Sequence, residues 1–198
     1  SAASDLFKRQ STSTFPEHLV KVATLAGATC GGFNDAQGSS ALFNKPAGIA
    51  LDRNGNLYVA DILNHRIRKI DASGNVTTLA GSGTSGFNDG SGDVARFNQP
   101  SGVAVDTSGN VFVADAWNHR NRRIDPIGNV TTFAGSGSRD SVDGYRTSAA
   151  FDVPYDLALD SSGNLYVADR FNYQIRKITP DGTVSTLAGS GSSGSADG

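Results

Sequence analysis

The sequence predicts an all-β fold of repeated four-stranded antiparallel sheets, and three observations carry this prediction. One unit recurs every 54 residues, each unit holds four extended runs, and turns rich in glycine and asparagine separate the runs. The composition agrees, with 24 glycines, no methionine and 18% charged residues among 198. Such usage is typical of short strands joined by tight turns rather than of helices.

The repeat keeps its register without insertion or deletion. Residues 22–27 (VATLAG) recur in closely similar form at 76–81, 130–135 and 184–189. The same offset relates two further sets of positions, Pro46, Pro100 and Pro154, and Asp61, Asp115 and Asp169. A period of this length identifies a repeat architecture, in which each unit is one small group of elements.

The first full unit shows its four runs in order. Strand a, 48–52, follows Pro46, because proline is tolerated at the start of a strand. The Gly-Asn turn at 52–56 leads to strand b, 57–60, and residues 61–64 turn the chain into strand c, 65–70. A second Gly-Asn turn, 71–75, returns it as strand d, 76–80. Four strands joined in this way form one blade.

One blade cannot bury its own apolar residues. Strand a of the first unit is almost wholly apolar (Ile49, Ala50, Leu51), as expected of a strand that is covered on both faces. Stacking blades radially supplies the cover, so the predicted architecture is a β-propeller. We expect blades at about 46–81, 100–135 and 154–189 within a propeller portion, 19–198. An extended N-terminal arm, 1–18, precedes it.

The segment Tyr58–Ile70 (YVADILNHRIRKI), with 112–124 and 166–178, resembles the NHL repeat, which is named for an Asn-His pair. In the third copy Tyr173 replaces the histidine, which favours a structural role for that position over a metal or catalytic one. The resemblance implies a six-bladed propeller, of which this chain holds about three blades. It also implies several candidate activities, because members of this family bind proteins or RNA, act in adhesion, or act as a metal-dependent lyase.

Strand d occurs four times, because residues 19–26 form an extra copy, whereas the other three strands occur three times each. We expect 19–26 to close a last blade whose other strands come from elsewhere, because a propeller must close to remove its sheet edges. A longer chain supplies them most economically. Two copies of this chain meeting head to tail rank second, because they would leave two d strands unused.

The charge and cysteine content limit the classes of partner that the chain is expected to have. The formal net charge is −2, which disfavours nucleic acid, and no apolar run is long enough to span a membrane. Cys30 is the only cysteine, so no disulfide can form within the chain, and its role stays open. Asn75 and Asn129 lie in N-x-Thr acceptor sequons at equivalent turns, which favours a secreted, glycosylated protein, with a cytoplasmic location as the alternative.

The b–c turns and the long d–a loops emerge on one face of a propeller. Leu63, Trp117 and Phe171 share one repeat position in the b–c turns, and Arg170 stands beside the last of them. An exposed ring of such side chains suits a protein or a sugar ligand, with Trp117 the foremost candidate. The alternative, equally weighted, is that these side chains pack under the long loops.

Two other recurring sets favour structural roles. The loop aspartates Asp35, Asp89, Asp143 and Asp197 are interpreted as turn caps rather than calcium ligands, and Phe43, Phe97 and Phe151 as loop anchors. The basic residues of strand c, from Arg66 to Lys177, read either as a phosphate-binding stripe or, more simply, as partners of the repeated aspartates.

No nucleophile motif, metal-ligand spacing or phosphate-binding loop is present in the sequence, so we predict no catalytic, metal or cofactor site. The predicted function is a non-enzymatic scaffold whose propeller face binds protein partners or joins the remaining blades. A glycan-binding module and a propeller lyase completed by other blades are the alternatives.

Overall fold

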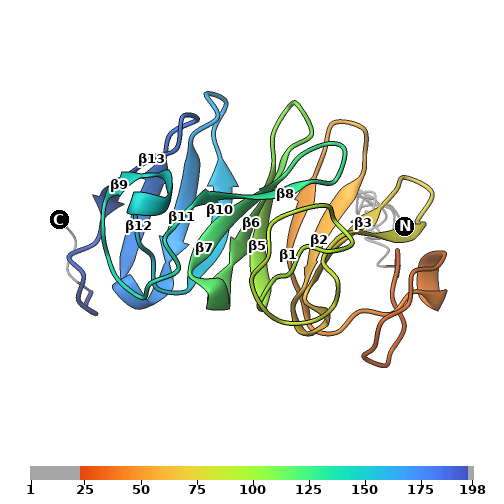
Figure 1. Cartoon of the computed structure of the whole chain (residues 1–198). Helices are drawn as coiled ribbons and strands as arrows, with labels where there is room; N and C mark the ends of the chain where they lie inside the picture. The colour runs from red at the N-terminus through yellow and green to blue at the C-terminus, as the bar shows by residue number, and fades with distance from the viewer. Residues whose placement is uncertain (1–22, 196–198) are drawn as a thin grey trace, which may run out of the picture.

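The computed structural model describes residues 23–195, which form three antiparallel sheets side by side (Figure 1). The predicted arm, 1–18, lies outside the described residues, and so do residues 19–22 of the predicted closing strand and the loop residue Asp197. Residues 23–26 of that strand are not paired in a sheet, so the closing strand stays a prediction. No helix within the described part of the chain is long and apolar enough to cross a membrane.

Each sheet is one blade with its strands in sequence order. The first blade contains β1 (Pro46–Leu51), β2 (Leu57–Asp61), β3 (Arg66–Ile70) and β4 (Val76–Ala80). The second contains β5 (Pro100–Val105), β6 (Val111–Asp115), β7 (Arg120–Ile124) and β8 (Val130–Ala134). The third contains β10 (Pro154–Leu159), β11 (Leu165–Asp169), β12 (Gln174–Ile178) and β13 (Thr183–Ala188). A short strand, β9 (Gly144–Tyr145), pairs with β13 as a fifth member.

Short 3₁₀ helices occupy the connections. Three of them form the b–c turns, namely η2 (Ile62–Asn64), η3 (Ala116–Asn118) and η5 (Arg170–Asn172). Two others, η1 (Gly38–Ser40) and η4 (Arg146–Ser148), lie in the long loops. The structure therefore confirms the predicted all-β fold class of four-stranded antiparallel blades.

The a–b turns form as their residue types predict. Asp52 accepts hydrogen bonds at 2.8 Å from the backbone N–H groups of Asn54 and Asn56, and Gly55 supplies a φ of 82°. Asp106 and Asp160 repeat this arrangement in the other two blades. These side-chain acceptors satisfy backbone donors that the hairpin leaves unpaired.

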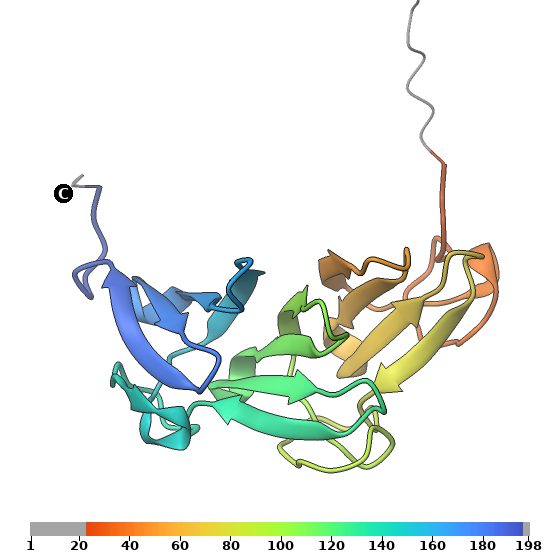
Figure 2. The same ribbon diagram turned by 90° about the horizontal axis from the view of Figure 1, so that it is seen from above.

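Seen from above, the blades form an open arc with β1, β5 and β10 innermost (Figure 2). Glycines set the close approach of these inner strands. A Cβ on Gly48 would lie 2.3 Å from the carbonyl oxygen of Ser101, and one on Gly102 would lie 2.8 Å from that of Tyr155. No side chain fits at those distances, so this junction geometry requires glycine.

The core lies between the blades. Phe97 is fully buried between the first and second blades, and Phe151 between the second and third, as expected of loop anchors. The two ends of the arc leave equivalent faces uncovered. Ile49 is 60% exposed, whereas Val103 at the same repeat position is 4% exposed. At the other end Ile175 is exposed, although its counterpart Ile67 is fully buried. Each end thus presents the surface that neighbouring blades bury.

Candidate binding face

Buried aspartates organise each b–c turn. Asp115 lies at the end of β6, where its Oδ1 accepts the backbone N–H of Asn98 at 2.8 Å. Its Oδ2 accepts the side-chain Nδ2 of Asn118 at 2.8 Å. Asp61 and Asp169 make the same contacts in the other blades. The asparagine of the Asn-His pair therefore closes the turn from which the neighbouring side chains project.

A buried arginine joins each turn to its long loop. The Arg122 guanidinium lies 2.6 Å from Asp115 Oδ2 and 2.6 Å from Asp89 Oδ1, and it donates to the backbone carbonyl oxygens of Asn88 and Arg96. Asp89 also accepts the backbone N–H of Thr132. Arg68 and Arg176 occupy the same position in the other blades.

These pairs bear out the simpler interpretation for three of the basic residues in strand c. Arg68, Arg122 and Arg176 are fully buried and paired with aspartates, as the simpler interpretation predicted. The interpretation of Asp35, Asp89 and Asp143 as turn caps was wrong. Each instead ties its loop to an arginine of strand c and to the backbone of strand d. Sequence spacing did not show this, because the paired residues are 33 positions apart.

Burial disfavours the charged form of the aspartates that begin the b–c turns of the second and third blades. Burial raises the pKa of Asp115 to about 6, against the opposing effects of Arg122 and the hydrogen bonds from Asn118 and Asn98. Burial also raises the pKa of Asp169. The arginine is the group that keeps such a buried carboxylate charged at neutral pH.

The histidines of the Asn-His pairs join neighbouring blades. His65 Nδ1 accepts the backbone N–H of Gln99 at 3.1 Å, and His119 Nδ1 accepts that of Val153 at 3.2 Å. A ring nitrogen that accepts a hydrogen bond carries no proton, so these imidazoles are neutral with the proton on Nε2. Burial lowers the pKa of both rings, which agrees with that state. The position is structural, as the Tyr173 replacement indicated.

Three apolar side chains project from the b–c turns. Leu63 is 37% exposed, Trp117 48% and Phe171 41%. Their backbone N–H groups are held by carbonyl oxygens at the ends of the long loops, those of Asn44, Asn98 and Asp152. Each turn is thus joined to its long loop through the backbone, and its apolar side chain is partly exposed beside that loop. We call the surface formed by these three residues the binding face.

Arg170 extends the binding face in the third blade. Its guanidinium carbon lies 4.9 Å from the centre of the Tyr155 ring and 5.4 Å from that of Phe171. These distances are within the range of a cation–π contact. Sequence reasoning selected Arg170 and Phe171 but missed Tyr155. Comparison of strand a across the repeats would have found it, because Ala47 and Ser101 stand at the equivalent positions.

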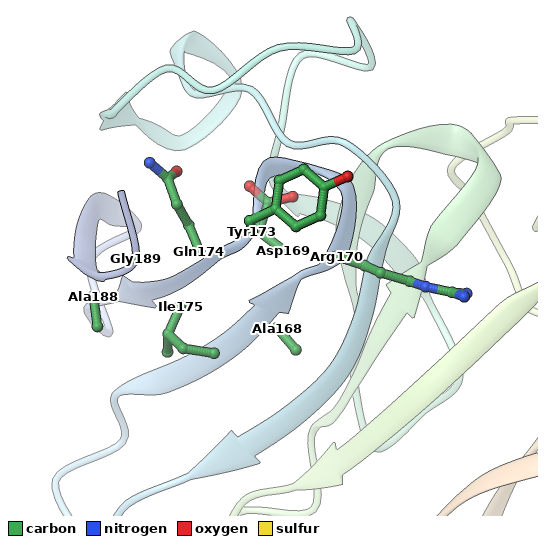
Figure 3. Close-up of a pocket in the computed structure, with 8 residues that line it drawn as sticks. All are labelled: Ala168, Asp169, Arg170, Tyr173, Gln174, Ile175, Ala188 and Gly189. Carbon is green, nitrogen blue, oxygen red and sulfur yellow. The ribbon is translucent and has the colours of Figure 1, made fainter. Parts of the chain in front are cut away.

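A shallow hollow of about 250 Å³ lies beside this group (Figure 3). Its rim combines polar and apolar residues from the end of β11, the b–c turn, β12 and the end of β13. They are Ala168, Asp169, Arg170, Tyr173, Gln174, Ile175, Ala188 and Gly189. Arg170 and Tyr173 extend from the turn in Figure 3, and the Arg170 side chain points away from Gln174, Ile175 and Ala188.

The predicted glycosylation positions differ in exposure. Asn129 is exposed at the turn between β7 and β8, and its side chain donates to Asp125 at 3.3 Å. Asn75 is half-buried, because its backbone pairs with Gln37 of the long loop. The two sequons occupy equivalent positions in the repeat, but Asn129 is more exposed than Asn75.

Between residues 23 and 195, no group of three or more His, Cys, Asp or Glu side chains lies close enough to hold a metal ion. Cys30 is exposed and lines a hollow near Lys45 at the end of the first blade. The candidate functional features of the described chain are thus the exposed side chains of the b–c turns, Arg170 beside them and the two sequons.

The repeated blades define a β-propeller, and the comparisons with known proteins assign its class. Residues 43–70 and 97–120 match the NHL repeat. NHL repeat-containing protein 2 of Bos taurus is 35% identical over 160 residues, which are 73% of this chain and 22% of that protein. The chain belongs to the NHL-repeat family.

Two further likenesses bear on function and fold. A probable peptidyl-alpha-hydroxyglycine alpha-amidating lyase of Caenorhabditis elegans is 32% identical over 139 residues, covering 68% of this chain and 37% of the lyase. A solved structure of a protein of unknown function from Bacteroides thetaiotaomicron superimposes with a TM-score of 0.67 at 27% identity, over 79% of this chain and 39% of the other. The chain thus spans well under half the length of these three proteins.

Proposed function

We propose that this chain is the part of an NHL propeller whose binding face contacts a protein partner. The observation that carries the proposal is the exposure of Leu63, Trp117 and Phe171 at one repeat position, on turns that buried ion pairs hold rigid. Aromatic and large apolar side chains on a rigid frame lose little entropy on binding and are enriched in binding hot spots. Completion of the ring by further blades would place these side chains around one mouth of the propeller.

The test compares two exposed apolar residues at opposite ends of the second blade. A partner is isolated from the source organism by covalent crosslinking to the protein, and its affinity is then measured for the Trp117→Ala and Ile127→Ala variants. Ile127 is exposed in the c–d turn, at the other end of β7 from Trp117. We expect Trp117→Ala to weaken binding by about 30-fold, the effect of a typical hot spot, and Ile127→Ala to leave it unchanged. Equal affinities of the two variants would contradict the proposal.

The likeness to an amidating lyase supports a second candidate function, an enzyme whose remaining active-site residues come from other blades. Assay of the protein with a peptidyl-α-hydroxyglycine substrate, together with metal analysis, separates this candidate from the first. Turnover that is lost on metal removal would establish the lyase. A protein that binds its partner and has no turnover would support the scaffold.

The exposed Trp117 ring also supports a glycan ligand, because a flat aromatic face suits the apolar face of a sugar. A glycan array separates this candidate from protein binding. Retention of the protein on defined glycans, lost in Trp117→Ala, would establish it.

We propose further that the protein is extracellular and carries N-linked glycan, and the accessible Asn129 sequon supports this. We expect glycan on Asn129 in preference to Asn75, because Asn75 is partly covered by the long loop. Peptide mass analysis before and after enzymatic removal of N-glycans measures the occupancy of each position. An unmodified Asn129 peptide in the native protein would contradict the proposal.

A further inference from the structure

The third repeat keeps its framework and changes one corner of the blade. Its buried network is intact, with Arg176 paired to Asp169 and Asp143 as in the other blades. Around Arg170, however, the residue types depart from both other copies. The changed positions, with their counterparts in the first and second repeats, are Tyr155 (Ala47, Ser101), Asp156 (Gly48, Gly102), Arg170 (Ile62, Ala116) and Tyr173 (His65, His119).

These departures lie together in space. Asp156 pairs with Ala168 in the sheet, two residues before Arg170. Tyr155 stacks on Arg170, and Tyr173 lines the same hollow as Arg170 (Figure 3). We call Tyr155, Asp156, Arg170 and Tyr173 the third-blade corner. Further departures from both other copies lie outside this corner, among them Thr179, Thr183 and Ser185.

Two of the changes remove the devices that join one blade to the next. At the equivalents of Asp156, a Cβ would meet the backbone of the following blade at 2.3 and 2.7 Å, so an aspartate does not fit that junction. Tyr173 replaces the histidine whose Nδ1 accepts the backbone N–H of the following blade. The junction of this edge with a neighbouring blade therefore differs from the junctions that follow the first and second blades.

The other two changes create a cationic group held by aromatic rings. Arg170 and Tyr155 appear together in this repeat, and the guanidinium lies within cation–π distance of both the Tyr155 and Phe171 rings. Among the residues that the structure describes, no carboxylate lies within ion-pair distance of Arg170, in contrast to the buried Arg176. A stacked guanidinium keeps its in-plane N–H donors free, and their geometry matches a carboxylate.

We propose that the third-blade corner binds an acidic peptide segment, in which an Asp or Glu carboxylate pairs with Arg170 and a neighbouring apolar side chain packs on Tyr155 and Phe171. This inference rests on the proposed protein-binding function and names the chemistry of the partner.

The test pans a phage-displayed library of random dodecapeptides on the protein. Recovered peptides are synthesised twice, once unchanged and once with Gln or Asn in place of each Glu or Asp. Their affinities are measured for wild type and for Arg170→Ala, Trp117→Ala and Arg53→Ala. Arg53 is an exposed arginine in an a–b turn at the opposite end of the first blade, so Arg53→Ala controls for the change in net charge. Circular dichroism confirms that each variant is folded.

We expect the recovered peptides to be enriched in acidic residues. Loss of the carboxylate or of Arg170 should each weaken binding by about tenfold, with no further loss when both are removed, whereas Arg53→Ala has no effect. Peptides that depend on Trp117 but not on Arg170 or on their own acidic residues would overturn this inference and leave the proposed function standing. Recovery of no peptide that depends on either Trp117 or Arg170 would overturn both.

Discussion

Replacing Asn121 by isoleucine is expected to stabilise the protein by about 2 kcal/mol. Asn121 is fully buried in β7, and neither its side-chain oxygen nor its nitrogen has a hydrogen-bond partner among residues 23–195. The equivalent positions in the other repeats hold Ile67 and Ile175. A polar side chain thus occupies an apolar position between the second and third blades.

The magnitude follows from three contributions. An unsatisfied buried polar group costs about 1–3 kcal/mol, and burying an isoleucine side chain contributes about 1.5–3 kcal/mol. Fitting the larger apolar side chain into a packed site costs about 1–3 kcal/mol, which offsets part of the gain. A net gain of about 2 kcal/mol corresponds to a rise in Tm of roughly 4–8 °C for a domain of this size.

Urea unfolding followed by circular dichroism measures this change, with the m-value checking that both proteins expose the same surface. The reverse substitution at the two equivalent positions provides matched controls. Ile67→Asn, at a fully buried position, is expected to cost about 3 kcal/mol, whereas Ile175→Asn, at an exposed one, should cost less than about 0.5 kcal/mol. A destabilised Asn121→Ile protein, or equal costs at Ile67 and Ile175, would refute the reasoning.

Three further predictions test contacts that stabilise the blades and their junctions. Arg122→Met should cost about 3–5 kcal/mol in urea unfolding, because it leaves the buried Asp115 without its counter-charge, and a loss below about 1 kcal/mol would contradict this. Gly102→Asp should cost more than about 3 kcal/mol, because its side chain would meet the backbone of β10, whereas Gly194→Asp, with open space around it, should cost little in the same assay. Burial and a hydrogen bond to Asp52 raise the pKa of Tyr58 to about 12, so its stabilisation is full below pH 10 and is lost as the pH rises through 12. Ultraviolet titration should show less late ionisation in Tyr58→Phe than in wild type, with a remainder from Tyr166, whose pKa its hydrogen bond to Asp160 also raises, and identical titration curves would contradict the assignment.

Much of the fold was predictable from the sequence because a strict repeat makes each element visible three times. The Gly-Asn turns and the apolar strand a follow from local chemistry, so the blades could be derived strand by strand. The pairing of Arg68, Arg122 and Arg176 with repeated aspartates also followed, because both recur in every unit, although the particular loop aspartates that take part did not. The exposure of Trp117 was not decided by sequence, since nothing local shows whether the long loops cover a side chain.

The contacts between blades were beyond the sequence. His65 accepts a hydrogen bond from Gln99, 34 residues away, and the need for glycine at Gly48 comes from the backbone of the next blade. These requirements arise only when the blades pack together, so no local sequence pattern indicates them. The meaning of Asp156 in the third repeat therefore emerged only when the junctions of the other blades were known.

Placement of a photo-crosslinking amino acid at position 117, and separately at position 127, tests the binding face most directly. The two sites lie at opposite ends of the same blade and are both exposed, so they differ only in the face that they sample. We predict that the native partner is crosslinked from position 117 and not from position 127. Crosslinking from position 127 alone would contradict the assignment of the b–c turns as the binding face.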